Sequence, residues 1–284
     1  MTVYLNGIFL PIAEAKISVL DRGFIFGDGV YEVIPVYSRH IFRLSEHLQR
    51  LQRSLDSIQL GNPSTEAEWT NIIHELVGRN EPEDQYLYLH ITRGVAKRDH
   101  AFPCPAVSPT VFLMSYPLNT PSPMLLQNGI SAITAPDNRW LRCDIKAISL
   151  LPNVLLRQMA IDAGCAETIM IRDNEFLTEG SSSNIFVVKN GVLLAPPKNN
   201  LMLPGITYDV VLELALANGI PHQIRKVLVS EVFDADELLL TSSTKEVLAI
   251  VQLDDKLIGT GKPGEMFTKL HNLYQKFKQE IMRA

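Results

Sequence analysis

Two Asn-Gly dipeptides, Asn6-Gly7 and Asn190-Gly191, place the tightest local constraint on how this chain folds. The first lies between the apolar runs V-Y-L and I-F-L. Asn-Gly favours the two successive positive φ angles that a two-residue hairpin turn requires. The sequence therefore predicts an antiparallel hairpin at the start of the chain and another in its second half.

Two amphipathic patterns follow the first hairpin. Leu48, Leu51, Leu55 and Ile58 recur at spacings of three, four and three, which predicts a helix with Ser45 as its N-cap. A T-x-x-E motif of Thr65 and Glu68 predicts a capping box at the start of a second helix. Strands are expected at 30–37, 86–92 and 111–114, and Pro35 requires an edge or a bulge in the first of them. The first 116 residues are therefore predicted to be α+β.

Prolines and polar residues between 117 and 128 predict an interdomain linker. The predicted domains are a small N-terminal α+β domain, 1–116, and a larger C-terminal α/β domain, 129–284. In the second domain we expect strands near 131–134, 168–172 and 238–240, and helices near 153–163, 208–218 and 267–282. The expected fold class is mixed α/β with two domains.

Composition argues against several classes of function. The net charge is −5, and acidic residues are spread among basic ones, so no surface for nucleic acid or an anionic membrane is predicted. Apolar runs fall well short of the roughly 20 residues of a membrane span, and the N-terminal stretch lacks a secretory pattern. Three cysteines without a C-x-x-C pair predict reduced thiols, and histidine spacing predicts no metal site. A cytoplasmic location is expected.

Lys146 stands between the polar run R-W-L-R-C-D-I and the apolar run A-I-S-L-L. A partly desolvated lysine is a nucleophile that forms imines with aldehydes. The alternative is a lysine that extends from the end of a strand into solvent.

Two segments offer donors for an anion. Pro204-Gly205-Ile206-Thr207 precedes a helix whose free amides would suit a phosphate, although Thr207 acting as an ordinary N-cap is the alternative. The run T-S-S-T at 241–244 follows a buried strand. Its hydroxyls either bind an anion or are simply polar groups where the strand ends at the surface.

Two further segments carry ionisable groups in loops. Glu179 lies at the end of a strand in F-L-T-E-G-S-S-S-N-I-F, which lacks the second glycine of a serine-hydrolase elbow. Its serines and Asn184 would alternatively bond their own backbone. Arg98 and His100, two residues apart, would clamp a carboxylate if they point the same way. The alternative there is a solvated charged loop.

Taken in order, five segments resemble the fold-type IV pyridoxal-phosphate enzymes, a group that includes D-amino-acid transaminases, branched-chain aminotransferases and aminodeoxychorismate lyases. The resemblance covers nearly the whole chain. Its segments are D-R-G-F-I-F-G-D-G-V-Y-E-V (21–33), F-R-L-S-E-H-L-Q-R-L (42–51), R-W-L-R-C-D-I-K (139–146), T-E-G-S-S-S-N-I-F (178–186) and G-I-T-Y-D-V (205–210).

The resemblance implies roles for individual residues. Lys146 would hold pyridoxal 5'-phosphate as a Schiff base and shuttle the proton, and Glu179 would pair with the pyridine nitrogen. Tyr31 would lie beside the Schiff base. The phosphate would be bound by Arg50, Ile206, Thr207, Ser242 and Ser243.

Among these enzymes, the D-amino-acid transaminases also carry G-D-G-V-Y-E-V and the R-x-H pair. The resemblance implies that Arg98, His100 and Tyr31 bind the substrate carboxylate. It further implies ping-pong amino transfer from a D-amino acid such as D-alanine to 2-oxoglutarate or pyruvate. A homodimer is expected, with active sites near the subunit interface and a loop that reaches into the neighbouring site.

Two positions depart from the pattern of this group. Ala147 follows the lysine where serine is common, and Pro35 interrupts a strand that usually has no proline. The resemblance therefore does not fix the shape of the pocket near these two positions. An L-branched-chain aminotransferase, an aminodeoxychorismate lyase and a non-catalytic dimer of the same fold are the alternatives.

Overall fold

The computed structural model describes residues 1–284, which form two compact units. The first comprises Met1–Asn119, Ile145–Leu150 and Met282–Ala284, and the second comprises Thr120–Asp144 and Leu151–Ile281. The domain limits expected from the sequence stay a prediction. The units add two details: the expected linker contains a short helix, and 145–150 pack with the first unit although they lie beyond that linker.

The first unit combines one sheet with three helices and a 3-10 turn. Its elements are β1 (Thr2–Leu5), β2 (Ile8–Pro11), η1 (Ile12–Glu14), α1 (Arg22–Phe26), β3 (Gly29–Tyr37), β4 (His40–Ile41), α2 (Leu44–Ser57), α3 (Glu66–Arg79), β5 (Gln85–Thr92) and β6 (Thr110–Pro117).

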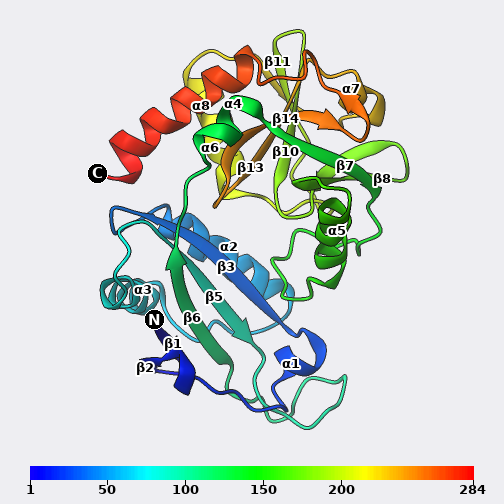
Figure 1. Ribbon diagram of the computed structural model, residues 1–284. Helices are drawn as coiled ribbons and strands as arrows, with labels where there is room; N and C mark the ends of the chain where they lie inside the picture. Colours follow the sequence, from blue (N-terminus) through cyan, green and yellow to red (C-terminus); the bar gives the residue numbers. More distant parts are fainter. The chain divides into compact units, whose positions relative to one another are not determined.

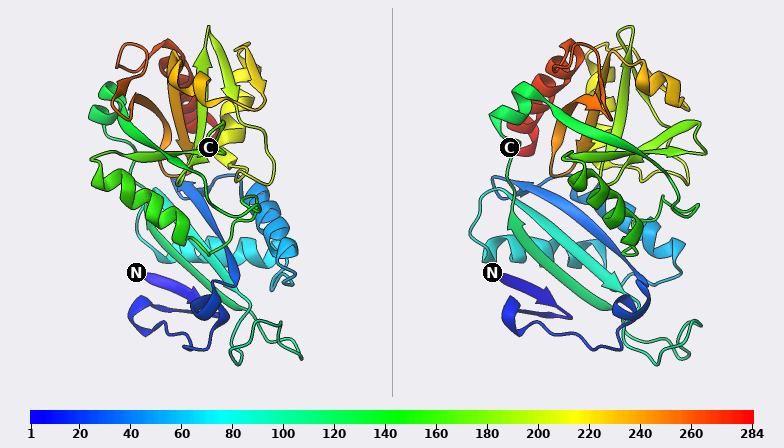
Figure 2. Two further views of the ribbon diagram at one scale, coloured as in Figure 1. Left: turned by 90° about the vertical axis from the view of Figure 1, so that its right-hand side faces the viewer. Right: turned by 45° about the vertical axis from the view of Figure 1, so that its right-hand side comes forward.

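The sheet of the first unit is antiparallel, in the order β2-β1-β6-β5-β3-β4. Helices α2 and α3 lie on the same side of it (Figures 1 and 2). Their apolar faces form one core with alternate residues of the strands, because successive strand side chains point to opposite faces. This core includes Leu51, Leu55, Trp69, Ile34 and Leu89.

The predicted first hairpin is confirmed, since β1 and β2 pair around Asn6 (φ 47°) and Gly7 (φ 98°). Pro35 was expected at an edge or a bulge, and its strand β3 is the last but one of the sheet, with only the two-residue β4 outside it. β5 pairs along β3 on one side, whereas only the two-residue β4 and the 146–148 segment bond to the other. The Pro35 carbonyl accepts from Phe42 N on that outer side, so the missing N–H interrupts no long ladder.

One capping prediction is confirmed and another is wrong. Thr65 and Glu68 form the capping box of α3, with Thr65 N donating to Glu68 Oε2 at 2.7 Å. Ser45 is not the N-cap of α2. The N-cap is Arg43, in a left-handed conformation, so the helix begins two residues earlier than expected and Ser45 lies in its first turn.

The second unit holds the larger sheet. Its elements are α4 (Pro123–Asn128), β7 (Ile130–Pro136), α5 (Leu151–Asp162), β8 (Glu167–Arg172), β9 (Phe176–Gly180), β10 (Asn184–Lys189), β11 (Val192–Ala195), α6 (Ile206–Ala217), β12 (His222–Ile224), α7 (Val229–Phe233), β13 (Glu237–Ser242), β14 (Glu246–Leu253), β15 (Lys256–Leu257), α8 (Glu265–Phe277) and η2 (Lys278–Met282).

The strand order in the second unit is β12-β11-β10-β13-β14-β7-β8-β9, with β15 beside β14. Parallel pairs β14–β7, β7–β8 and β11–β12 are mixed with antiparallel ones, and the second predicted hairpin joins β10 to β11 through Asn190 and Gly191. α5 packs on β7 and β8, while α6 and α8 pack on β13 (Figure 2). The mixed α/β class is therefore confirmed. No helix combines the length and the apolar composition that a membrane crossing requires.

Candidate active site

Lys146 lies in the first unit, on a segment that runs beside β3. Its carbonyl accepts from Tyr31 N at 2.9 Å, and Ile148 N donates to Gly29 O at 3.1 Å. The lysine is 9% exposed, and its Nζ lies 4.0 Å from the centroid of the Tyr31 ring. The predicted desolvation of Lys146 is therefore confirmed, and the solvated-lysine alternative is wrong. Tyr31 lies beside this amine, where the resemblance requires a tyrosine.

A second tyrosine and a histidine extend the wall next to Tyr31. The Tyr31 and Tyr88 rings are 5.6 Å apart between centroids, and the Tyr88 hydroxyl lies 2.8 Å from His90 Nδ1. Burial, together with the nearby Tyr31, raises the pKa of Tyr88 to about 12, and burial lowers the pKa of His90. Both side chains are thus neutral near pH 7. The sequence did not single them out, because their link to Tyr31 comes from the β3–β5 register.

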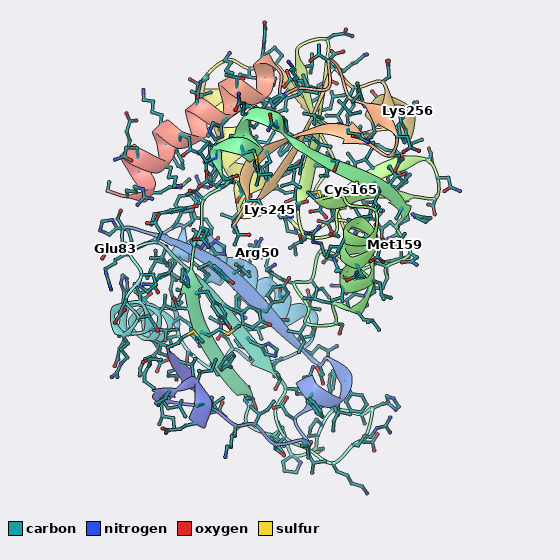
Figure 3. All side chains as sticks on the ribbon, viewed as in Figure 1. Arg50, Glu83, Met159, Cys165, Lys245 and Lys256 are labelled. Carbon is teal, nitrogen blue, oxygen red and sulfur yellow. The ribbon has the colours of Figure 1, made fainter.

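Arg50 projects from α2 (Figure 3) and is held in a buried charged cluster. Its Nε and Nη2 donate to the two Glu32 oxygens at 2.8 and 2.7 Å, and His47 Nδ1 lies 2.8 Å from Glu32 Oε2. Burial alone would raise the pKa of Glu32, but Arg50 and His47 lower it below its usual range. Burial lowers the pKa of His47, whose Nε2 is buried without a hydrogen-bond partner. The cluster fixes the direction of the guanidinium.

Arg98 and His100 are both exposed, as the alternative of a solvated charged loop predicts, and the clamp stays a prediction. Both lie against the ring of Phe26. The Arg98 guanidinium carbon is 5.4 Å from the centroid of that ring, and the centroid of the His100 ring is also 5.4 Å from it. The two side chains therefore share one aromatic contact.

Glu179, on β9 of the second unit, is buried among donors. Arg139 Nη1 donates to its Oε1 at 2.6 Å, while Leu203 N and Asn184 Nδ2 donate to Oε2 at 3.2 and 3.3 Å. Burial raises the pKa of Glu179 to about 7, although Arg139 acts to lower it. A cation placed near this carboxylate would favour its ionised form.

Arg139 is itself held by a second carboxylate. Its Nε and Nη2 each donate to Asp137 at 2.9 Å, and Thr178 Oγ1 donates to the same carboxylate at 2.7 Å. Arg172 Nη2 lies 3.3 Å from Asp137 Oδ1. Although burial acts to lower it, the pKa of Arg139 is raised by Asp137 and Glu179. Arg139 thus stays charged beside Glu179. It opens the R-W-L-R segment, but spacing alone did not connect it with a carboxylate 40 residues away.

The serines after Glu179 satisfy a different buried carboxylate. Ser181 and Ser183 hydroxyls donate to Glu167, the latter at 2.9 Å, and Lys245 Nζ donates to it at 3.1 Å. Glu167 is fully buried. The alternative in which these serines bond their own backbone is therefore wrong. Their hydroxyls instead stabilise the buried charge of the Glu167 carboxylate.

The first turn of α6 carries the predicted phosphate donors Ile206 and Thr207. Its N-cap is Gly205, and no side chain caps the turn, so the alternative with Thr207 as N-cap is wrong. A Cβ on Gly205 would lie 2.0 Å from Asn184 Oδ1, which excludes any larger residue. Because Asn184 also bonds Glu179 and the Leu203 carbonyl, it ties the carboxylate to this turn. The free amides and the helix dipole favour an anion there.

Ser242 ends β13, and Ser243 lies in the turn that leads to Lys245, which is labelled in Figure 3. Ser242 Oγ accepts from Lys245 N at 3.1 Å, which orders the turn. The preceding Thr241 hydroxyl is buried without a hydrogen-bond partner. The turn therefore presents hydroxyl groups in the same unit as the α6 amides.

These two units have the fold of an aminotransferase. A branched-chain amino acid aminotransferase of T.th., solved with pyridoxamine 5'-phosphate, matches 100% of this chain and 95% of its own with a TM-score of 0.91 and 26% identity. The model of the amino-transferase class IV family matches residues 29–253, and the chain belongs to that family. It is 41% identical to a D-alanine aminotransferase of Bacillus licheniformis, over 97% of this chain and 96% of the relative. The D-alanine aminotransferase of Staphylococcus haemolyticus is 38% identical, over 97% of each chain.

Proposed function

We propose that this aminotransferase uses pyridoxal 5'-phosphate to move the amino group of a D-amino acid, such as D-alanine, to 2-oxoglutarate or pyruvate. The observation that carries the proposal is the full-length match to D-alanine aminotransferases, at 38–41% identity. The solved relative with pyridoxamine 5'-phosphate supports the cofactor.

The residues present fit this cofactor. A buried lysine, a buried carboxylate with a raised pKa and an uncapped helix start are the groups that an aldehyde, a pyridine nitrogen and a phosphate would need. Bound pyridoxal phosphate supplies an aldehyde that captures amines and a ring that accepts electrons. The residues that would hold it are Lys146, Glu179, Arg50, Tyr31, Ile206, Thr207, Ser242 and Ser243.

Lys146 would act twice. Its amine would hold the cofactor through a covalent link, and when a substrate amine replaces that link, the freed Lys146 amine would act as the base that takes the proton from the substrate α-carbon and returns it to the cofactor side. Glu179 holds the proton of the pyridine nitrogen, and Arg139 holds Glu179 in place. A second oxo acid would then reverse these steps, which gives ping-pong kinetics.

Arg98 and His100, with Tyr31, would bind the α-carboxylate of the substrate. Charge-assisted hydrogen bonds from a guanidinium are strong and directional, so the position of the carboxylate decides for which enantiomer the single α-hydrogen faces Lys146. The common contact of Arg98 and His100 with Phe26 supports this role.

A substrate panel tests the proposal. Purified protein with added pyridoxal phosphate is assayed with D- and L-alanine, D- and L-glutamate and L-leucine, each with 2-oxoglutarate or pyruvate. We expect the D-isomers to be faster in kcat/KM by at least about 100-fold, since a site built to bond a polar group rejects substrates that misplace it. Preference for L-leucine would favour the branched-chain alternative. Pyruvate released from aminodeoxychorismate without any oxo acid would favour the lyase.

The Arg98→Ala variant should raise KM for D-alanine by about 10- to 100-fold, the loss of a hydrogen bond to a charged group worth about 1.5–3 kcal/mol. Lys97→Ala removes a cation next to it and is the matched control. Steady-state kinetics and the visible spectrum of the bound cofactor are measured together. An unchanged KM for D-alanine in Arg98→Ala would remove the substrate assignment, while an unchanged spectrum would keep the cofactor assignment.

We further propose that the protein is a homodimer with its active sites near the subunit interface. Each unit leaves large apolar side chains exposed, including Val19 (72%) and Phe24 (70%) in the first and Leu141 (62%) and Val154 (59%) in the second. Such exposure is typical of association surfaces. Sedimentation equilibrium at micromolar concentration should give twice the 31.8 kDa of one chain. A monomer mass would contradict the dimer.

A cytoplasmic location is also proposed. Its support is that the three cysteines are free thiols, as expected in a reducing compartment. Recovery of the native protein in an extracellular fraction would contradict it.

A further inference from the structure

One buried arginine binds the backbone of the loop that carries Arg98 and His100. Arg22 Nη1 donates to the carbonyls of Asp99 at 2.6 Å and Ala101 at 3.2 Å, and its Nη2 donates to the His100 carbonyl at 3.4 Å. Three successive carbonyls therefore bond to one guanidinium. Because that group is planar and rigid, it fixes the path of the chain between residues 99 and 101.

A second set of contacts holds Arg22 in place. Its Nε donates to Asp28 Oδ2 at 2.8 Å, and Arg93 donates to both Asp28 oxygens at 2.8 and 3.0 Å. Although burial acts to raise it, the pKa of Asp28 is lowered by these arginines, so the carboxylate stays charged near pH 7. Arg93 also donates to the carbonyl of Ile58, the residue that follows α2. This bond anchors the network to the core of the unit.

The ring of Phe26 connects this network with the side chains of the loop. The Arg22 guanidinium carbon lies 4.9 Å from the ring centroid, and Arg98 and His100 contact the same ring. Arg22 therefore acts on the loop in two ways, through the carbonyls of its backbone and through the ring against which its two functional side chains rest.

We infer that Arg22 is a positioning residue, which together with Asp28 and Phe26 holds Arg98 and His100 in the geometry that binds a substrate carboxylate. This inference rests on the proposed function for the identity of the carboxylate. It gives a role to the D-R-G-F-I-F-G-D segment at 21–28, which supplies all three of these supporting residues.

The test replaces Arg22 by glutamine and by lysine. In Arg22→Gln we expect KM for D-alanine to rise at least about tenfold, with a much smaller change in kcat, since misplacement of a binding group costs up to about 100-fold. Amides within residues 98–102 should exchange with deuterium faster than in the wild type. Arg22→Lys keeps the charge without the planar fork, so it should restore KM and exchange only in part.

Arg39→Gln is the matched control. Its guanidinium also donates to three carbonyls of the first unit, those of Val77, Asn80 and Glu81, and its Nε also donates to a carboxylate, that of Glu83. Loss of the Arg39 guanidinium should leave unchanged both KM for D-alanine and the rate of amide hydrogen exchange of residues 98–102. An equal rise in KM for both variants would mean that Arg22 supports the fold in general, and would overturn the inference.

Two further readouts keep the inference separate from the proposed function. If Arg22→Gln does not fold, Phe26→Leu removes the shared ring without breaking the buried ion pairs and should raise KM in the same way. A wild type inactive on D-amino acids would refute the proposed function, whereas faster exchange of 98–102 in Arg22→Gln would still support positioning. A wild type active on D-alanine, with neither KM nor exchange altered in the variants, would refute the inference alone.

Discussion

Replacement of Lys146 by alanine should lower kcat for D-alanine by about 10⁴-fold, since the variant loses both the covalent attachment of the cofactor and the group that moves the proton. The fold should survive this change. Lys146 is held through its backbone, whose carbonyl accepts from Tyr31 N and whose N–H donates to Ser54 Oγ at 3.2 Å. Rates are measured by following pyruvate formation, and covalent attachment is measured by borohydride reduction followed by peptide mapping.

The wild-type protein should carry the pyridoxyl label on the peptide that contains Lys146. Lys189→Ala is a suitable control, because that lysine pairs with Asp234 and Asp236 at the surface and has no proposed catalytic role. Label on any other lysine, or transamination by Lys146→Ala at the native rate, would refute the central assignment.

The second large effect is expected for Glu179→Gln. The amide keeps the size of the carboxylate but cannot hold the proton of a pyridine nitrogen by charge, so kcat should fall by about 10²- to 10³-fold, as for other preorganised electrostatic groups. Glu179→Asp keeps the charge with a shorter reach and should lose less. The pH titration of the visible band of the bound cofactor should shift in Glu179→Gln and stay closer to the wild type in Glu179→Asp. An unchanged titration would remove the proposed role of Glu179.

The same carboxylate should make the stability of the cofactor-free protein depend on pH. Because burial raises the pKa of Glu179 from 4.5 to about 7 on folding, the native state binds more protons than the unfolded state within that window. The contribution of Glu179 to stability therefore falls as pH rises from about 5 to about 8, by about 3 kcal/mol at 1.36 kcal/mol per pKa unit. Urea unfolding at both pH values should show this loss in the wild type relative to Glu179→Gln. Parallel behaviour of the two proteins would contradict the raised pKa.

The features that depend on a few neighbouring residues were predicted well. The two Asn-Gly turns and the capping box of Thr65 and Glu68 are in place, because φ preferences and short hydrogen bonds act within four residues. The Ser45 cap was wrong for the same kind of reason. Arg43 adopts a left-handed conformation, so the helix starts two residues earlier, and the preference of arginine for that conformation is weak.

The candidate site was predictable where a residue type is chemically indispensable. The roles of Lys146 and Glu179 were predicted from the family motifs that contain them, and the structure adds that both side chains are buried. No role was predicted for three other buried charged residues, Glu32, His47 and Arg139, although each makes short hydrogen bonds to a charged partner. Their pairing depends on how strands and helices pack, which the sequence did not show.

The sequence by itself determined the local turns, the helix and strand periods, the family motifs and the chemical identity of the candidate groups. Tertiary structure alone decided that the segment with Lys146 packs beside β3, that the serines at 181 and 183 serve Glu167, and that Arg22 holds the loop of Arg98 and His100. The physical reason is range. A dihedral preference acts between neighbours, whereas a buried charge is satisfied by whichever hydrogen-bond partners the packed chain brings to it, here across 79 residues between Arg22 and Ala101.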